Sequence, residues 1–295
     1  MTPPFTIRPL SAADIPVVTA WARAEGFVPG SGDLAIYRHT DAQGLWVGCL
    51  DGEPIGCIAG VRYDPSYGFI GLFLVRPDQR GRGYGLQLWR QALEHLRDVR
   101  CIGIEAAPDR IEDYAGWGFR PAAPTRRWRR RGDGHTTIAP PPPPSAMPWR
   151  LEPLEAVPEA VVQAYDARHE ATPRPHFLGD WLHHPAGTVR LLLDGDGRCR
   201  GFGRIRPCLL PVGRGWRVGP LIADTPPLAD ALLAALLAAH PGVVLIDAPA
   251  ANPHAAPLLA ERGFTAVGET LRMYRGPAPR LPLDEIYGLA CLELG

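Results

Sequence analysis

The sequence predicts a mixed α/β fold that occurs twice along the chain. Over residues 67–97 an apolar strand leads into a glycine-rich loop and then a helix with one apolar face, which is the pattern of a helical crossover. The pattern of strand, polar break and helix at 5–18 begins again at 149–162. We therefore expect two similar units, each with a mixed sheet and flanking helices.

The expected elements follow the same order in both units. In the first unit we expect strands at 5–10, 45–50, 54–63, 67–75, 100–106 and 125–130, and helices at 12–25, 33–39, 84–97 and 109–116. In the second unit we expect strands at 188–193, 200–210, 215–223, 243–247, 267–275 and 286–293, and helices at 227–239 and 252–262. The helix at 227–239 is apolar on most sides, so we expect it to be buried.

A proline-rich segment separates the two units. Pro140 to Pro144 favour polyproline II and exclude a helix or a central strand, so we interpret residues 136–148 as a semi-rigid linker. The first domain is then 1–135 and the second is 149–295. The arginine-rich stretch before the linker, at 126–131, is typical of an edge strand with alternating exposure.

The composition excludes several classes of partner. The formal net charge is zero, so nothing indicates binding to nucleic acid or to a membrane surface. No apolar stretch reaches the roughly 20 residues of a membrane helix, and the start of the chain lacks a secretory pattern. We expect a cytoplasmic protein, a monomer or a homodimer, from a bacterium with GC-rich coding, because all 31 basic residues are arginine.

The cysteines and histidines do not have metal-ligand spacing. The six cysteines occur singly in apolar stretches, which predicts reduced cysteines in the core. HEATPRPH at 169–176 is not an HExxH motif, and His183-His184 stands alone. We therefore expect no metal site.

The loop QRGRGYG at 79–85 has the properties of a phosphate site. It lies between an apolar strand and the N-terminus of a helix, where free amides and the helix dipole both favour an anion. Arg80 and Arg82 would add charge-assisted hydrogen bonds. A nucleotide-hydrolysing P-loop needs a lysine, which the chain lacks, and the dinucleotide fingerprint needs a glycine where Leu86 or Leu88 stands.

Residues 80–85 (RGRGYG) resemble the RxxGxG/A acyl-coenzyme A signature of the GNAT superfamily of N-acetyltransferases. The preceding LFLVRPD, the following helix, the strand CIGIEAA and the YxxxGF segment at 114–119 extend the resemblance over most of 5–130. It implies acetyl-CoA as co-substrate, with the pyrophosphate on the loop and the pantetheine arm beside the strand that ends at Val75. The residues implied to bind it are Phe73, Leu74, Val75, Arg80, Gly81, Arg82, Gly83, Tyr84 and Gly85.

The resemblance also assigns catalytic roles. Tyr114 matches the family tyrosine that protonates the departing thiolate. The family's usual base, a glutamate on the strand before the loop, is replaced here by Gly71. Glu105 is the candidate base nearest in sequence, Asp64 and Glu53 are weaker candidates, and a water chain or an amine that arrives neutral would also serve. A further hypothesis is that the chain end, 293–295, brings its carboxylates to the active site, as in some two-domain relatives.

The second unit resembles a degenerate GNAT-like domain. ADTPPLADALL stands where the first unit has its glycine loop, and Leu259 stands where the first has Tyr114. We therefore expect acetyl transfer to the amine of a small molecule in the first domain, with the second domain shaping the acceptor site. A non-catalytic acyl-CoA sensor or scaffold and a protein N-acetyltransferase remain alternatives.

Overall fold

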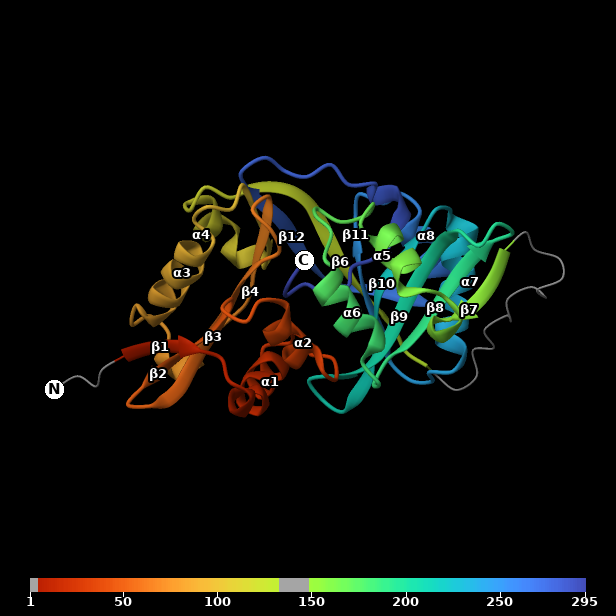
Figure 1. The fold of residues 1–295 in the computed structure, drawn as a ribbon. Coiled ribbons are helices and arrows are strands. Elements are labelled where there is room, and N and C mark those ends of the chain that lie inside the picture. The colour runs from red at the N-terminus through yellow and green to blue at the C-terminus, as the bar shows by residue number, and fades with distance from the viewer. Residues whose placement is uncertain (1–4, 133–148) are drawn as a thin grey trace.

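One continuous mixed sheet runs through both halves of the chain (Figure 1). The computed structural model describes residues 5–132 and 149–295. Within these residues thirteen strands form the sheet, twelve of them in the order β1-β2-β3-β4-β5-β12-β6-β11-β10-β9-β8-β7, while β13 pairs with β10 off this path. The linker expected at 136–148 lies outside the described residues.

The elements of the first half agree closely with the sequence pattern. Its strands are β1 (Phe5–Pro9), β2 (Leu45–Leu50), β3 (Glu53–Arg62), β4 (Tyr67–Val75), β5 (Cys101–Ala106) and β6 (Arg120–Arg130). Its α-helices are α1 (Ile15–Ala24), α2 (Asp33–Thr40), α3 (Tyr84–His95) and α4 (Ile111–Ala115).

The second half repeats this order with the same number of α-helices and one further strand, β13. Its strands are β7 (Trp149–Pro153), β8 (Thr188–Asp194), β9 (Cys199–Leu209), β10 (Arg214–Ala223), β11 (Val244–Pro249), β12 (Phe264–Arg275) and β13 (Ile286–Gly288). Its α-helices are α5 (Glu159–Asp166), α6 (Pro175–His183), α7 (Pro226–Ala238) and α8 (Ala255–Glu261). The strand expected at 286–293 is wrong beyond Gly288, because the chain there leaves β10 and crosses to the first half.

Each half contributes one long strand, β6 or β12, to the other half's part of the sheet. β12, from the second half, lies between β5 and β6, and β6, from the first half, lies between β12 and β11 (Figure 1). The prediction of an edge strand at 126–131 is therefore wrong. Both edges of β6 are paired, and its arginines alternate between the two faces of a central strand.

The halves also share a buried core. Phe177 and Trp181 of α6 pack in one cluster with Leu34 and Tyr37 of the first half. Beside them Asp33 of α2 accepts a bidentate ion pair from Arg206 of β9, with Nε to Oδ1 at 2.7 Å and both side chains at 1% exposure or less. Such a pair, desolvated and fully bonded, fixes the relative position of the elements that carry it.

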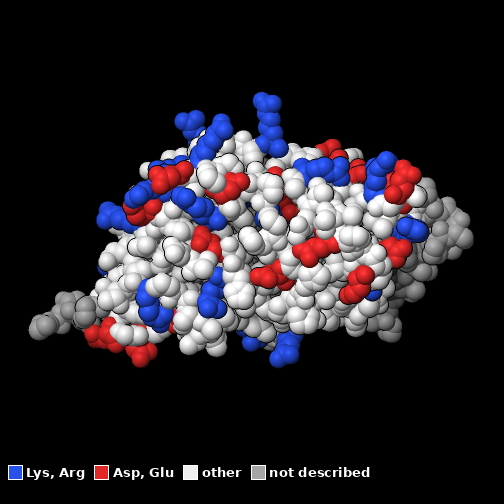
Figure 2. Space-filling view, viewed as in Figure 1, with Lys and Arg blue, Asp and Glu red and all other residues white. Residues whose placement is uncertain are grey.

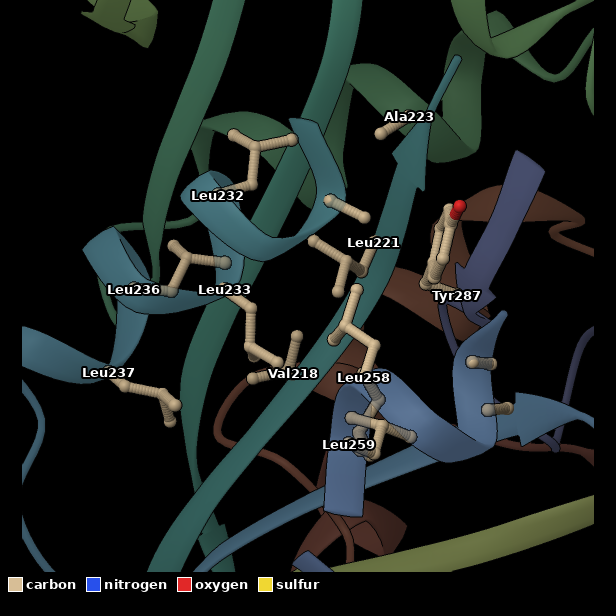
Figure 3. Close-up of a cluster of buried hydrophobic side chains, with 14 of the residues drawn as sticks. Val218, Leu221, Ala223, Leu232, Leu233, Leu236, Leu237, Leu258, Leu259 and Tyr287 are labelled. Atoms are coloured by element: carbon tan, nitrogen blue, oxygen red, sulfur yellow. The ribbon is translucent and has the colours of Figure 1, made fainter. Parts of the chain in front are cut away.

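Helix α7 is buried on most sides, as its composition predicted. Its buried leucines Leu232, Leu233, Leu236 and Leu237 face the sheet formed by β8, β9 and β10 (Figure 3). The expectation for the cysteines is also confirmed, because all six are free and buried.

The surface carries charges of both signs. On the face drawn in Figure 2, acidic and basic side chains are interspersed and neither sign covers a large area. This distribution is consistent with the formal net charge of zero. Among the described helices, none has the length and apolar character needed to cross a bilayer.

The strand exchange predicts that the halves do not fold alone. In a chain split within residues 133–148, the first half would lack β12 beside β5 and would leave both edges of β6 open, which favours aggregation. We expect each half, expressed alone, to show no cooperative melting transition by circular dichroism. Co-expression of both halves should restore one transition. A first half that is monomeric and melts cooperatively by itself would contradict this.

Candidate active site

The first half contains an open gap between β4 and β5. The two strands pair in parallel only from Tyr67 with Cys101 to Ile70 with Ile104, and then diverge. At the same point β4 has a bulge, in which Leu72 and Phe73 lie opposite a single residue of β3 and Leu72 adopts a φ of 47°. A bulge leaves backbone groups outside the ladder, so this edge of β4 can pair with a ligand.

A cavity of about 810 Å³ occupies this gap and continues to the second half. One end is lined by β4, the glycine loop, α3 and α4. The other end is lined by residues that the exchanged strands and the chain end bring in: Thr125, Arg127, Asp247, Gly268, Glu269, Thr270, Leu292 and Glu293. Apart from Thr125 and Arg127 of β6, this second set comes from the second half, which therefore contributes to the site.

The glycine loop has the backbone that a close ligand requires. Gly81 and Gly83 adopt φ of 75° and 83°, and a Cβ built on either would meet no atom within 4 Å. They precede α3, whose first amides have no partner within the helix. Of the predicted loop residues, Arg80, Gly81 and Gly85 line the cavity. Arg82, Gly83 and Tyr84 do not, and the ring of Tyr84 stacks on Phe5 at 4.7 Å.

Two buried polar atoms at this end of the cavity lack partners. The indole Nε1 of Trp89 and the amide Oε1 of Gln79 have no hydrogen-bond partner among the described residues, although both residues line the cavity. Buried polar groups are usually satisfied. Phe73, Leu74 and Val75 of β4 line the same end of the cavity, and of their carbonyls that of Val75 accepts from Arg80 Nε. This edge of β4 and the two unpartnered atoms fit a polar, extended ligand such as an acyl-coenzyme A.

Tyr114 lies on the cavity wall against an aromatic cluster. Its ring centroid is 5.1 Å from that of Trp89 and 6.5 Å from that of Phe119. Burial raises the pKa of the Tyr114 hydroxyl above its ordinary value of 10. The hydroxyl therefore keeps its proton at neutral pH and can donate it.

Glu105 also lies on the wall, but its oxygens are already engaged. Its Oε1 accepts from Arg272 Nε at 2.6 Å and from Thr125 at 3.1 Å, and its Oε2 accepts from Thr270 at 2.7 Å. The side chain is 3% exposed. This environment is that of a structural ion pair that ties β5 to the exchanged strand β12. It is not the environment of a free base.

The two weaker candidates lie away from the cavity. Glu53 is exposed at the start of β3. Asp64 closes a turn by accepting from Ser66 and from the amide of Tyr67, and it also accepts from Thr172. Neither lines the cavity.

The chain end passes directly over Gly71. A Cβ placed on Gly71 would overlap the backbone carbonyl oxygen of Glu293. The segment after β13, residues 289–295, is called the tail below, and it can lie there only because residue 71 is glycine. Glu293 is one of the residues that line the cavity, and it is 5% exposed. Thus the position where the family's strand carries a glutamate is covered by a glutamate from the tail. The terminal carbonyl of Gly295 instead meets Arg174 Nη1 at 3.4 Å, outside this cavity.

The corresponding gap in the second half is filled by the chain itself. β10 and β11 pair in parallel at Trp216–Val218 and then diverge, as β4 and β5 do. β13 enters the gap, pairs with β10 at Leu221 and Ile222, and is followed by a bond from the Leu289 amide to the Asp247 carbonyl of β11. The space that is open in the first half is therefore occupied in the second.

A further cluster of polar residues lies near this filled gap. His169, Asp224 and Glu285 have ligand-type atoms within 4.8 Å of one another, a set that could hold a metal ion although the sequence spacing gave no sign of it. Both nitrogens of His169, both oxygens of Asp224 and Oε2 of Glu285 already have protein partners. His169 Nε2 meets Glu285 at 2.7 Å, and Asp224 accepts from Tyr165 and Arg200.

Comparison with known proteins agrees with this architecture. A family model described as Acetyltransferase (GNAT) family matches residues 17–119, and one described as Acetyltransferase (GNAT) domain matches residues 162–288. Holothin acyltransferase of Pseudoalteromonas sp. (strain SANK 73390) is 30% identical over 293 residues, which cover 99% of this chain and 95% of that protein. The chain belongs to the GNAT family of acyltransferases. The expected tandem arrangement is confirmed.

Solved structures share the whole fold. An acetyltransferase-like protein of Pyrococcus horikoshii superposes with a TM-score of 0.80 at 22% identity, covering 99% of this chain and 96% of its own. A tandem GNAT protein from the clavulanic acid biosynthesis pathway superposes with a TM-score of 0.68 at 18% identity, covering 93% and 100%. At these identities the likeness concerns the fold alone.

The contact between Gly71 and the tail gives a direct test. Gly71→Ala forces the tail away from β4, and we expect it to lower the free energy of unfolding by about 1–3 kcal/mol, as overpacking does, and to lower acyl transfer. Gly195→Ala is the matched control, because a Cβ there would meet no atom within 4 Å. Chemical denaturation measures both variants. Equal stability of the two would contradict the contact.

Proposed function

We propose that the protein transfers an acetyl group from acetyl-CoA to the amine of a small molecule in the cavity between β4, β5 and the chain end. The observation that carries the proposal is the continuity of one cavity from the glycine loop, past Tyr114, to Glu293. The relative named as holothin acyltransferase, a protein named for the acylation of one compound, supports a small-molecule acceptor.

A thiol-release assay with acetyl-CoA and a panel of amines tests the proposal, and absence of turnover with every amine would contradict it.

The chain's own groups would hold the co-substrate along the gap. The amides at the start of α3, with Arg80 beside them, suit the pyrophosphate, whereas Arg82 does not line the cavity. The edge of β4 from Phe73 to Val75 suits the amides of the pantetheine arm, although the Val75 carbonyl already accepts from Arg80 Nε at 2.9 Å. The coenzyme then supplies a thioester at the far end of the gap, where the bulge at Leu72 leaves backbone groups free to polarise its carbonyl.

Glu293 and Tyr114 would each move one proton in the reaction. The Glu293 carboxylate takes one proton from the ammonium form of the acceptor, which gives the neutral amine, and later releases this proton to solvent. The amine nitrogen then forms its bond to the acetyl carbon and loses its second proton to solvent. As the bond from that carbon to sulfur breaks, the Tyr114 hydroxyl gives its proton to the sulfur and is reprotonated from solvent. We assign the base to Glu293 and not to Glu105, because both oxygens of Glu105 accept hydrogen bonds of 3.1 Å or less, whereas Oε1 of Glu293 has one contact among the described residues, at 3.5 Å.

The base assignment predicts a loss of rate in Glu293→Gln. The amide keeps the shape of the side chain but cannot take a proton, so we expect kcat/KM for the amine to fall by about 10²-fold or more. Steady-state thiol release measures it. Glu269→Gln is the control, because Glu269 also lines the cavity but is 48% exposed and pairs with Arg126, and it should change the rate less than about threefold.

The same variant has an expected pH dependence. Without a base only the neutral amine reacts, so the rate of Glu293→Gln should rise about tenfold per pH unit up to the pKa of the chosen amine. The natural protein should rise less steeply over that range. Parallel profiles for the two proteins would exclude Glu293 as the base.

The acid assignment predicts a selective loss in Tyr114→Phe. Because burial holds the pKa of Tyr114 above 10, its proton is present throughout pH 7–9, and its removal should lower kcat by about 10²-fold or more. The KM for acetyl-CoA should stay within about threefold, since the ring packing on Trp89 is kept. An unchanged kcat, or an equal loss of affinity for acetyl-CoA, would remove the assignment.

A further inference from the structure

We propose that Tyr37 and Arg217 are positioning residues that hold the Glu293 carboxylate so that its Oε1 atom faces the acceptor. The inference rests on the proposed function, because it concerns the same carboxylate. Tyr37 belongs to α2 of the first half and Arg217 to β10 of the second. Neither residue stands out in the sequence, and neither lines the cavity.

Three donors surround the carboxylate unevenly. The Tyr37 hydroxyl and the Leu292 amide both donate to Oε2, each at 3.1 Å. Oε1 has one contact among the described residues, Arg217 Nη1 at 3.5 Å. Oε2 is therefore anchored, while Oε1 keeps capacity to accept a further hydrogen bond. This asymmetry is what a base needs, one oxygen fixed and the other free for the acceptor.

Arg217 reaches the site from a fully buried position. It is 2% exposed, its Nη2 donates to Asp247 at 2.9 Å, and its Nη1 also approaches the carbonyl oxygens of Phe27 and Val28 at 3.3 Å. Asp247 in turn holds Arg127 through two bonds. The guanidinium of Arg217 thus contacts the second half, the loop after α1 and the tail. The contact of its Nη1 with Glu293 Oε1 at 3.5 Å restricts rotation of the carboxylate.

Tyr37 is equally fixed. It is 1% exposed and its ring stacks on Trp181 with centroids 6.5 Å apart. Burial raises the pKa of its hydroxyl well above 10, so it donates to Glu293 at every working pH. A rigid donor on Oε2 lowers the cost of orienting the base during the reaction.

A double-mutant cycle separates positioning from general structural support. We expect Tyr37→Phe to lower kcat/KM by about tenfold in the natural protein and by less than about twofold in Glu293→Gln, because a residue that acts through Glu293 has nothing left to position. Arg217→Lys, which keeps the charge but shortens the reach, should behave in the same way. Thermal melts of all variants establish that each is folded.

Tyr63→Phe is the matched control. Tyr63 also donates to the tail, at 2.9 Å, but its partner is the backbone carbonyl of Leu294 and not the carboxylate. Its substitution should cost the same small factor in both backgrounds. Equal losses from Tyr37→Phe in both backgrounds, or no loss at all, would overturn the positioning role and leave Glu293 as the base. An unimpaired Glu293→Gln would overturn the base and this inference together.

Discussion

The arrangement of the site depends on the close packing of the tail backbone on Gly71. With any side chain at that position the carbonyl of Glu293 would be displaced, and with it the carboxylate at the acceptor end of the cavity. Gly219, on the equivalent strand of the second half, packs in the same way on the carbonyl of Leu289. The tail therefore threads past two matched glycines, one in each half. Buried Ala290, Cys291 and Leu294 hold it in the shared core.

Because of this path of the tail, the gap between diverging strands is filled in the second half and open in the first. In the second half β13 completes the sheet where its strands diverge, and no room is left for an extended ligand beside β10. In the first half the tail arrives in an irregular conformation and leaves the gap beside β4 open. The same segment thus closes one gap and supplies a side chain to the other. Exchange of β6 and β12 then brings Arg127 and Thr270 to the open site, and β11, which pairs with β6, brings Asp247.

Local patterns in the sequence predicted most elements but not how the halves join. The strand, glycine loop and helix at 67–97 were identifiable because their periodicity and turn chemistry are local. The exchange of β6 and β12 was not, because a strand's partner is decided by contacts between residues more than a hundred positions apart. α6 was missed since its apolar face is short and follows Pro173 and Pro175.

The site shows the same division. Tyr114 and the glycine loop belong to contiguous sequence motifs. The absence of the family's glutamate was also visible in the sequence, because Gly71 stands at its position. The pairing of Glu105 with Arg272, and the contacts of Tyr37 and Arg217 with Glu293, join residues from both halves and have no local signal. The chain end could be suspected because it carries carboxylates and because the chain end reaches the active site in some two-domain relatives.

A crystal structure of the protein with coenzyme A and an amine acceptor tests the central claim most directly. We expect the coenzyme to lie on the glycine loop with its sulfur beside the Tyr114 hydroxyl. We expect the acceptor nitrogen to lie within hydrogen-bond distance of Glu293 Oε1, with the tail still packed on Gly71. Coenzyme bound beside β10 with β13 displaced, or Glu293 turned out of the cavity, would contradict it.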